Sequence, residues 1–277
     1  MWSPPYTPCS PADVALRTSL PATAERFSPC ALIPIYNHKK TITRTVQALR
    51  AQGLHVLIVD DGSDAATADV LDALVGEHAD IQLLRLPHNQ GKGRALTVGL
   101  LAAREAGYTH ALQIDADGQH DTADAPRFIA QAQANPQAMI CGRAVYDDSV
   151  PRARLYGRYL THVCVWIETL SLAINDSMCG YRLYPLAQTC AEIARAPMPA
   201  RMDFDTEIAV RLLWRGVPVR NLPTRVVYPE DGLSHFHMLH DNVRITAMHT
   251  RLLLGMLPRA PGLLWRRFRR KEVPCAA

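Results

Sequence analysis

The sequence lacks the features of a secreted, disulfide-stabilised or membrane-spanning protein. Its seven cysteines are odd in number and form no CxxC pair, which disfavours a disulfide framework or a structural zinc site and favours free thiols in a reducing compartment. No run reaches the roughly 18 uninterrupted apolar residues of a membrane span, because Glu168 and Arg251 interrupt the two best candidates. The beginning has neither the basic residues nor the apolar stretch of a secretory signal. We therefore expect a cytoplasmic protein.

Charge is nearly balanced overall but unevenly distributed. The net charge is +4, yet residues 243–277 hold eight Lys and Arg against one Glu, so the remainder is mildly acidic. Nucleic-acid binding is disfavoured, since the body is acidic and no recognition motif occurs. Residues 265–271 mix bulky apolar and basic side chains, as does a helix that lies in an anionic lipid surface. A solvated tail is the alternative interpretation.

Short apolar runs alternate with helical patterns, which predicts an α/β domain with a mainly parallel central sheet flanked by helices. Strands are expected at residues 31–35, 56–59, 81–86, 111–114 and 139–141. Helices are expected at 41–50, around 70–75, from about 93 to 106, and at 155–174, 205–214 and 241–257. We expect three parts: a disordered Pro-rich segment (1–29), the α/β domain (30–240), and a basic amphipathic helical tail (241–277).

Two of these helices carry more detailed expectations. In the helix at 155–174 the apolar spacing predicts one inward side, formed by Tyr159, Val163, Trp166, Ile167, Leu170 and Ile174. The helix at 241–257 should stop at Pro258, because proline cannot continue a helix without losing a hydrogen bond.

Two aspartates separated by one residue follow the predicted strand 111–114. In extended backbone, Asp115 and Asp117 point to the same side, and their hard oxygens suit Mn²⁺ or Mg²⁺. Gln119 is a candidate third ligand. Such an ion would bind a diphosphate and neutralise charge on a departing nucleotide. The alternative is a pair of solvated aspartates in a turn, since this spacing is frequent by chance.

Four segments in one order extend this pattern: Pro-Ile-Tyr-Asn at 34–37, Val-Asp-Asp-Gly-Ser at 59–63, Asn-Gln-Gly-Lys-Gly at 89–93, and Asp-Ala-Asp-Gly-Gln-His at 115–120. The series resembles family 2 glycosyltransferases, and especially the dolichol-phosphate mannose synthase-like branch, over roughly residues 30–228. The resemblance implies the GT-A fold, a Rossmann-like fold of enzymes that use nucleotide-diphosphate sugars.

The resemblance also implies roles for individual positions. The segment that wraps the nucleoside is matched by Pro34, Tyr36 and Asn37. Asp60, with Asp61 beside it, matches the acidic position that contacts the base or ribose, whose N–H and hydroxyl groups are donors. The metal- and diphosphate-binding motif is matched by Asp115, Ala116, Asp117 and Gln119.

Two basic residues add to the implied donor site. Lys92 lies between Gly91 and Gly93, but GxxxxGK[ST] is absent, so this is no P-loop. The resemblance implies glycines that permit close approach and a lysine facing the donor; a surface turn before a helix is the alternative. Arg182 ends a segment that resembles the family's Asp…Gly-Phe-Arg, with Tyr181 in place of Phe. It is either a bidentate phosphate ligand or a structural ion-pair partner.

Three carboxylates are candidates for catalysis. Inversion at the sugar carbon needs a carboxylate that accepts the acceptor's proton, and Asp205 and Glu207 are both candidates. Asp176 is either a base or an orienting group. An acceptor that is already an anionic phosphate would need no base. Residues 203–207 are alternatively an acidic helix N-terminus favoured by the helix dipole.

The last implied donor residues are Arg225 and His235. In the branch that the sequence resembles, a closing loop with the pattern Gly-x-Ser-Lys helps hold the donor phosphates. Here His235 replaces the lysine, so its charge varies near neutral pH.

We therefore predict a metal-dependent, inverting hexosyltransferase of cell-envelope biosynthesis. It would use a nucleotide-sugar donor and a lipid or polyprenyl-phosphate-type acceptor, with its C-terminal tail on the inner face of the cytoplasmic membrane. One alternative is a sugar-1-phosphate nucleotidyltransferase, although its glycine-rich basic loop is replaced at 36–38 by Tyr-Asn-His. The other is a membrane-associated protein that binds a nucleotide-sugar without turnover.

Overall fold

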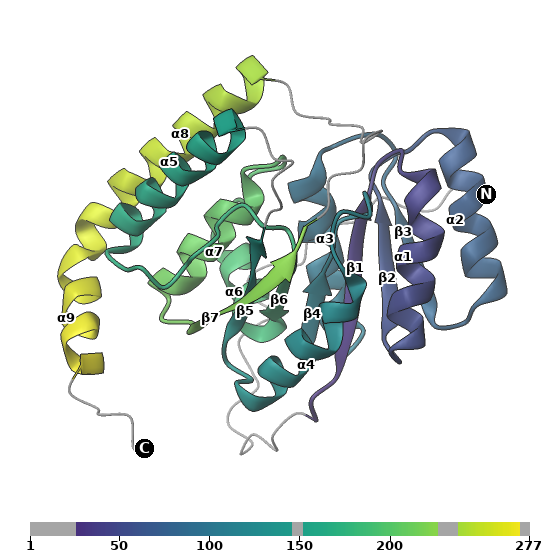
Figure 1. Cartoon of the computed structure of the whole chain (residues 1–277), viewed down its shortest axis with the longest axis horizontal. Coiled ribbons are helices and arrows are strands. Elements are labelled where there is room, and N and C mark those ends of the chain that lie inside the picture. The colour runs from purple at the N-terminus through teal and green to yellow at the C-terminus, as the bar shows by residue number, and fades with distance from the viewer. Residues whose placement is uncertain (1–25, 146–151, 227–237, 272–277) are drawn as a thin grey trace, which may run out of the picture.

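A seven-stranded sheet runs through the centre of the computed structural model, in the order β3-β2-β1-β4-β6-β5-β7 (Figure 1). The structure describes residues 26–145, 152–226 and 238–271. The strands are β1 (Pro29–Ile35), β2 (His55–Asp60), β3 (Ile81–Arg85), β4 (His110–Gln113), β5 (Met139–Val145), β6 (Arg182–Pro185) and β7 (Val219–Arg225).

Helices connect and cover these strands. They are α1 (Lys39–Ala51), α2 (Ala65–Glu77), α3 (Lys92–Glu105), α4 (Ala125–Ala134), α5 (Arg152–Thr169), α6 (Leu186–Arg195), α7 (Phe204–Trp214), α8 (Met238–Met256) and α9 (Ala260–Lys271), with short 3₁₀ turns at Thr122–Asp124 and Leu257–Arg259. The five strands expected from the sequence are confirmed. The pattern did not predict β6, β7, α4 or α6.

The predicted mainly parallel sheet is confirmed. Four of the six strand pairings are parallel, and β6 runs antiparallel to both β4 and β5. The strand order reverses direction around β1, with β2 on one side and β4 on the other. Open α/β sheets place their ligand crevice at such a switch point, outside the carboxyl ends of the strands.

Alternating side chains on the strands form two cores, one on each face of the sheet. On β1, Cys30 and Leu32 face a core that includes α3, α6 and α7. Ala31, Ile33 and Ile35 face a second core with α1, α2 and α4. Apolar burial on both faces explains why β1 and β2 are continuous hydrophobic runs in the sequence.

The predicted helix at 155–174 was wrong in its end and in part of its inward side, although Ile174 is buried as expected. α5 ends at Thr169, because Leu170 takes a positive φ of 49°. Tyr159 and Ile167 are 61% and 50% exposed. The buried side of α5 instead carries Val165 and the polar Thr161, Glu168 and Thr169, which follow a helical spacing.

Helices α5, α8 and α9 form a layer apart from the sheet, which we call the C-terminal layer. In Figure 1, α5 and α8 lie side by side and α9 follows beyond them. α8 begins at Met238 and ends at Met256, a residue before the predicted end. Pro258 does not end the helical path, because it lies at the start of a 3₁₀ turn that leads into α9. Within the described ranges, no helix is both long and apolar enough to cross a bilayer.

The prediction of disorder for the Pro-rich segment falls mainly on residues 1–25, which lie outside the described residues.

Two glycines provide a matched test of how α3 packs on the sheet. A Cβ at Gly99 would lie 2.9 Å from Val59 Cγ2 and even closer to Leu32 Cδ1, whereas a Cβ at Gly76 on α2 would meet nothing within 4 Å. We expect Gly99→Ala to lower the free energy of unfolding by about 1–3 kcal/mol through overpacking. Gly76→Ala should raise it by about 0.4–1 kcal/mol by restricting the unfolded chain.

Urea denaturation followed by circular dichroism measures both variants. Equal stabilities for Gly99→Ala and wild type would contradict the close packing of α3 on β1 and β2.

Candidate active site

The loops that follow β1, β2, β3 and β4 meet at one edge of the sheet, because these strands are parallel. Asn37 and Ser63 belong to two of them: the Asn37 N–H donates to Ser63 Oγ at 3.1 Å, and the Asp64 N–H donates to Asn37 Oδ1 at 2.8 Å. Asn37 has a positive φ of 60°. Pro34 is buried in β1, and Tyr36, the first residue after β1, is half-buried. The segment predicted to wrap the nucleoside therefore lies against the loop after β2.

Both aspartates at the end of β2 are buried and hydrogen-bonded. Asp60 accepts from the Ser63 N–H and from Arg85 Nε, each at 2.9 Å. Its side chain is only 1% exposed. Asp60 therefore links the loop after β2 to Arg85 on β3. With these contacts made, little of its carboxylate is left to bind a base or ribose.

Asp61 fixes the loop that precedes α3. Its carboxylate accepts from the backbone N–H groups of Gln90 at 2.7 Å and Gly91 at 2.8 Å, and from Asn89 Nδ2 at 3.1 Å. Arg201 donates to Asn89 Oδ1 at 2.7 Å and extends this network. Burial is the main cause that raises the pKa of Asp61 above its usual value.

The glycines on either side of Lys92 allow the backbone there to lie very close to another segment of the same chain. Gly91 has a positive φ of 103°, and a Cβ there would lie 2.5 Å from Arg201 Cδ. A Cβ at Gly93 would meet Phe204 Cβ at 2.7 Å and the Pro199 carbonyl. Residues 91–93 therefore pack tightly against residues 199–204, at the beginning of α3.

Lys92 joins two carboxylates from distant parts of the chain. Its ammonium lies 2.7 Å from Asp115 Oδ1 and 2.9 Å from Asp205 Oδ2. Burial alone would lower the pKa of Lys92, but the two carboxylates outweigh it and raise that pKa. Burial would likewise raise the pKa of Asp115, but Lys92 and His120 hold it well below its usual range. Lys92 and Asp115 therefore both carry charge near neutral pH.

Asp205 is further constrained by two uncharged side chains. Gln113 Nε2 donates to Asp205 Oδ1 at 2.9 Å, and the Tyr184 hydroxyl donates to Gln113 Oε1 at 3.1 Å. Both Asp205 oxygens are thus already hydrogen-bonded. Sequence reasoning missed Gln113, whose signal was a polar residue at the end of an otherwise apolar strand.

Glu207 lies on a different side of α7 from Asp205, since residues two apart on a helix do not face each other. It is fully buried and forms ion pairs with Arg211 on α7 and Arg251 on α8. The structure therefore places Asp205 beside Lys92 and turns Glu207 toward the C-terminal layer.

Asp117 and Gln119 lie in the turn after Asp115. The Gln119 N–H donates to Asp117 Oδ1 at 3.0 Å. Burial, followed by the nearby Asp115 charge, raises the pKa of Asp117. Ala116 is buried, and its carbonyl accepts from the Thr41 hydroxyl on α1. This turn is thereby fastened to the first helix.

His120 and Gly180 also adjoin Asp115, and sequence reasoning gave neither a role. His120 Nε2 lies 3.8 Å from Asp115 Oδ2. A Cβ at Gly180 would lie 2.9 Å from Asp115 Cγ and Oδ1 and closer still to Oδ2. Any larger residue at 180 would therefore displace the Asp115 carboxylate.

Asp115 and Asp117 fit a divalent ion as an incomplete ligand set. Among the described residues, no group of three or more His, Cys, Asp or Glu side chains is arranged to hold a metal. Mg²⁺ sites are often of this open kind, with one or two carboxylates and the substrate phosphates. The residues present therefore suit an ion that also binds a diphosphate.

Arg182 is completely buried and binds backbone carbonyls. Its guanidinium donates to the carbonyls of Asp205, Ser177 and Asp176. It thereby ties the segment before β6 to the start of α7. Of the two predicted interpretations, these contacts favour a structural role, with carbonyls in place of a carboxylate.

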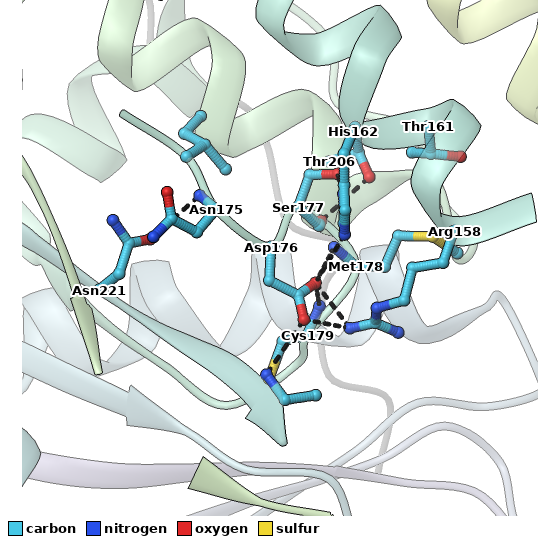
Figure 2. Close-up of polar contacts among 12 residues, drawn as sticks. Arg158, Thr161, His162, Asn175, Asp176, Ser177, Met178, Cys179, Thr206 and Asn221 are labelled. Carbon is cyan, nitrogen blue, oxygen red and sulfur yellow. Dashed lines mark hydrogen bonds and ion pairs between the residues drawn. The ribbon is translucent and has the colours of Figure 1, made fainter. Parts of the chain in front are cut away.

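Asp176 anchors the beginning of α5 (Figure 2). Arg158 donates to both carboxylate oxygens, at 2.6 Å to Oδ1 and 2.5 Å to Oδ2. The carboxylate also accepts from three backbone N–H groups, those of Ala144, Met178 and Cys179. Burial opposes ionisation of Asp176, but Arg158 outweighs it and lowers the pKa. Of the two roles predicted for Asp176, these contacts favour that of an orienting group over that of a base.

Of the two remaining predicted donor residues, the structure describes only Arg225. Arg225 is exposed at the end of β7, one residue before Val226, which forms an isolated bridge with His120. His235 lies outside the described residues, as does the rest of the predicted closing loop at 227–237.

The pattern of Glycosyl transferase family 2 matches residues 30–195, more than half of the chain. The chain belongs to glycosyltransferase family 2. The match covers the loops after β1 to β4, and it ends with α6, before Asp205.

Two curated relatives of this family 2 chain are named for a lipid phosphate, and a third is named for polyprenol monophosphomannose. The chain is 28% identical over 220 residues to a dolichyl-phosphate beta-glucosyltransferase from Dictyostelium discoideum, covering 73% of this chain and 64% of that protein. It is 29% identical over 217 residues to an undecaprenyl-phosphate mannosyltransferase from Micrococcus luteus, covering 73% and 85%. A polyprenol monophosphomannose synthase from Mycolicibacterium smegmatis is 25% identical over 250 residues, covering 84% and 90%.

The chain thus spans less than two thirds of the Dictyostelium relative's length and most of the two bacterial relatives. The predicted resemblance to family 2 and to its dolichol-phosphate mannose synthase-like branch is confirmed.

Solved structures confirm the GT-A fold. Glucosyl-3-phosphoglycerate synthase from Mycobacterium tuberculosis, solved with phosphoglyceric acid, superposes with a TM-score of 0.58 at 15% identity and covers 84% of this chain and 80% of its own. TarS residues 1–349 from S. aureus, solved with UDP-GlcNAc, gives 0.54 at 14% identity, covering 84% and 72%.

The Asp176 cluster gives a test of the site's architecture. In Asp176→Asn, an amide NH₂ would replace an oxygen that accepts from N–H groups, leaving buried donors without acceptors. We expect a loss of about 3–5 kcal/mol in the free energy of unfolding, typical of breaking a buried ion pair. Asp72→Asn is the matched control, because Asp72 is 59% exposed where it pairs with Arg85; it should cost at most about 1 kcal/mol.

Denaturant titrations at several pH values extend this test. Because the folded-state pKa of Asp176 is lowered, its contribution is fully present above the unfolded value of about 3.9. It is lost as pH falls through the folded value. The wild-type advantage over Asp176→Asn should therefore be constant from about pH 5 to 7 and shrink in stronger acid. A difference independent of pH throughout would contradict an ionised Asp176.

Proposed function

We propose that this chain is an inverting glycosyltransferase that moves a hexose from a nucleotide-diphosphate sugar to a polyprenyl-phosphate-type lipid at the cytoplasmic face of a membrane. The observation that carries the proposal is the cluster of Asp115, Asp117, Lys92 and Asp205 at the carboxyl edge of the sheet. Membership of family 2 and the names of the curated relatives support the donor and acceptor classes.

Asp115 and Asp117 would hold Mn²⁺ or Mg²⁺, with Gln119 as a further ligand. The ion, when bound, supplies positive charge that stabilises the departing nucleoside diphosphate. The chain's own residues fix the geometry: Gly180 leaves room for the Asp115 carboxylate, and Lys92 orients it. The turn at 115–118 is fastened to α1 through the Thr41 hydroxyl.

The three carboxylates that are candidates for a catalytic base are already paired with other groups, and this supports an acceptor that is already anionic. Both Asp205 oxygens are hydrogen-bonded, Glu207 is paired with two arginines, and Asp176 is saturated by Arg158 and backbone donors. A hydroxyl acceptor would need a base with an available oxygen. A lipid phosphate attacks through an oxygen that has no proton to lose, so it fits this arrangement.

A transfer assay tests the proposal. The full chain is incubated with Mn²⁺, a panel of UDP- and GDP-hexoses and a polyprenyl phosphate, and labelled lipid is extracted. We expect Asp115→Asn to lower transfer by at least about 100-fold, because metal charge stabilisation supplies several kcal/mol. Asp69→Asn, an exposed change on α2, should leave transfer unchanged.

Two further measurements, nucleotide-sugar binding and incubation with a nucleoside triphosphate and a sugar 1-phosphate, identify the alternatives. Nucleotide-sugar binding without transfer would indicate a binding protein, and pyrophosphate release from a nucleoside triphosphate would indicate a nucleotidyltransferase. If Asp115→Asn transfers sugar as fast as wild type, the metal-dependent mechanism fails.

Peripheral membrane contact through the C-terminal tail is the second part of the proposal. The end of α8 and the turn after it expose Leu254 and Leu257 by 61% and 58%, and Trp265 on α9 is 56% exposed. Two basic residues lie next to Trp265: Arg267 is exposed and donates to the Leu170 carbonyl, and Arg266 is partly buried and donates to the Trp214 carbonyl. Apolar side chains beside basic ones favour an anionic lipid surface.

Co-sedimentation with phosphatidylcholine vesicles, with and without phosphatidylglycerol, tests this contact. Replacing both Leu254 and Leu257 by Ser should weaken binding to anionic vesicles by at least about tenfold, because each buried leucine contributes roughly 1.5–3 kcal/mol. Leu101→Ser is the control, since Leu101 is also exposed, by 42%, but lies on α3. Equal losses in both variants, or binding that added salt does not weaken, would contradict the proposal.

A further inference from the structure

The Lys92 ammonium occupies the inner side of the carboxylate that the proposed function assigns to a metal. It lies 2.7 Å from Asp115 Oδ1 and 2.9 Å from Asp205 Oδ2. The exposed fractions of the three side chains are 16% for Lys92, 23% for Asp115 and 6% for Asp205. The cluster is therefore largely shielded from water, and charges within it interact strongly.

The position of Lys92 is fixed by the backbone rather than by a flexible loop. Lys92 is the first residue of α3, and the glycines on both sides pack against residues 199–204. Its second partner, Asp205, is itself held by Gln113. The ammonium is therefore held between two carboxylates whose own positions are fixed.

This placement has opposite effects on a bare ion and on a nucleotide. A divalent ion at Asp115 meets the positive charge of Lys92, which opposes binding. A nucleoside diphosphate is an anion, which the same positive charge favours. An ion that arrives with the diphosphate brings its own negative charge into the site.

We propose that Lys92 is an internal counter-ion that makes divalent-metal binding at Asp115 depend on the nucleoside diphosphate. In the free protein, the ammonium balances Asp115 and Asp205 and keeps the affinity for a bare ion low. With nucleotide, the diphosphate offsets the ammonium and supplies the missing metal ligands. Lys92 is thus a positioning residue for Asp115. This inference rests on the proposed function, because it requires that a metal binds at Asp115.

The experiment measures Mn²⁺ binding by the electron paramagnetic resonance signal of free Mn²⁺, using the full chain with and without UDP or GDP. In the wild type, nucleotide should tighten Mn²⁺ binding by at least tenfold. In Lys92→Met, Mn²⁺ alone should bind at least tenfold more tightly than in wild type, while UDP or GDP alone should bind more weakly. Lys39→Met, an exposed change on α1, is the control and should alter neither affinity.

A second variant guards against loss of folding in Lys92→Met, where Asp115 and Asp205 would face each other without the ammonium. Lys92→Met combined with Asp205→Asn removes one positive and one negative charge, and the amide oxygen that the second substitution introduces can still accept from Gln113. This double variant should also bind Mn²⁺ alone more tightly than wild type, with circular dichroism confirming the fold.

The outcomes separate the two proposals. If the wild type binds Mn²⁺ equally with and without nucleotide, or if the folded variants bind Mn²⁺ no more tightly than wild type, the counter-ion role of Lys92 is overturned. If the wild type binds no Mn²⁺ even with UDP or GDP, the metal-dependent function itself is overturned.

Discussion

The ion pairs between Lys92 and two aspartates connect parts of the chain that the sequence keeps far apart. Asp115 follows β4, and Asp205 lies in the first turn of α7 some ninety residues later. The loop before α3 is folded around Asp61 and pressed onto residues 199–201. The ammonium can therefore reach both carboxylates at once. Lys92 provides the ion pairs of this link, and Gln113 and Arg182 add hydrogen bonds from the sheet to Asp205.

In several places in this protein, a buried carboxylate links a helix to another helix or to a loop through an ion pair. Asp176 holds Arg158 of α5, Glu207 holds Arg251 of α8, and Glu168 of α5 lies 2.7 Å from His249 of α8. Each costs desolvation energy that the partner must offset, so removing one partner is far more destabilising than the pair is stabilising. Such pairs specify where the C-terminal layer sits. They also explain why acidic residues that resemble catalytic groups in the sequence are engaged by arginine in the fold.

Much of the fold could be predicted from local patterns, whereas the site could be predicted only in part. β1, β2 and α1 follow from apolar periodicity, because both faces of the sheet are buried. β6 is a four-residue strand, Arg-Leu-Tyr-Pro, whose buried polar side chains hide it from such a pattern.

The positions of Asp115 and Asp117 follow from the strand end, but their partners do not. No spacing rule brings Lys92 to Asp205 or turns Asp60 toward Arg85, since those contacts depend on the tertiary fold. The inward side of α5 was mispredicted for a related reason: it packs through polar residues that bind other helices, and periodicity counts only apolar ones.

The reversed direction of β6 has a consequence for which residues can enter the site. The residues that follow a parallel strand lie at the carboxyl edge of the sheet. For an antiparallel strand, the residues that precede it lie at that edge. Arg182, the first residue of β6, pairs with Gln113, the last residue of β4. Gly180 therefore arrives beside Asp115 from upstream. Insertions between α5 and β6 would thus remodel the surroundings of Asp115, whereas insertions between β6 and α6 would emerge at the opposite end of the sheet.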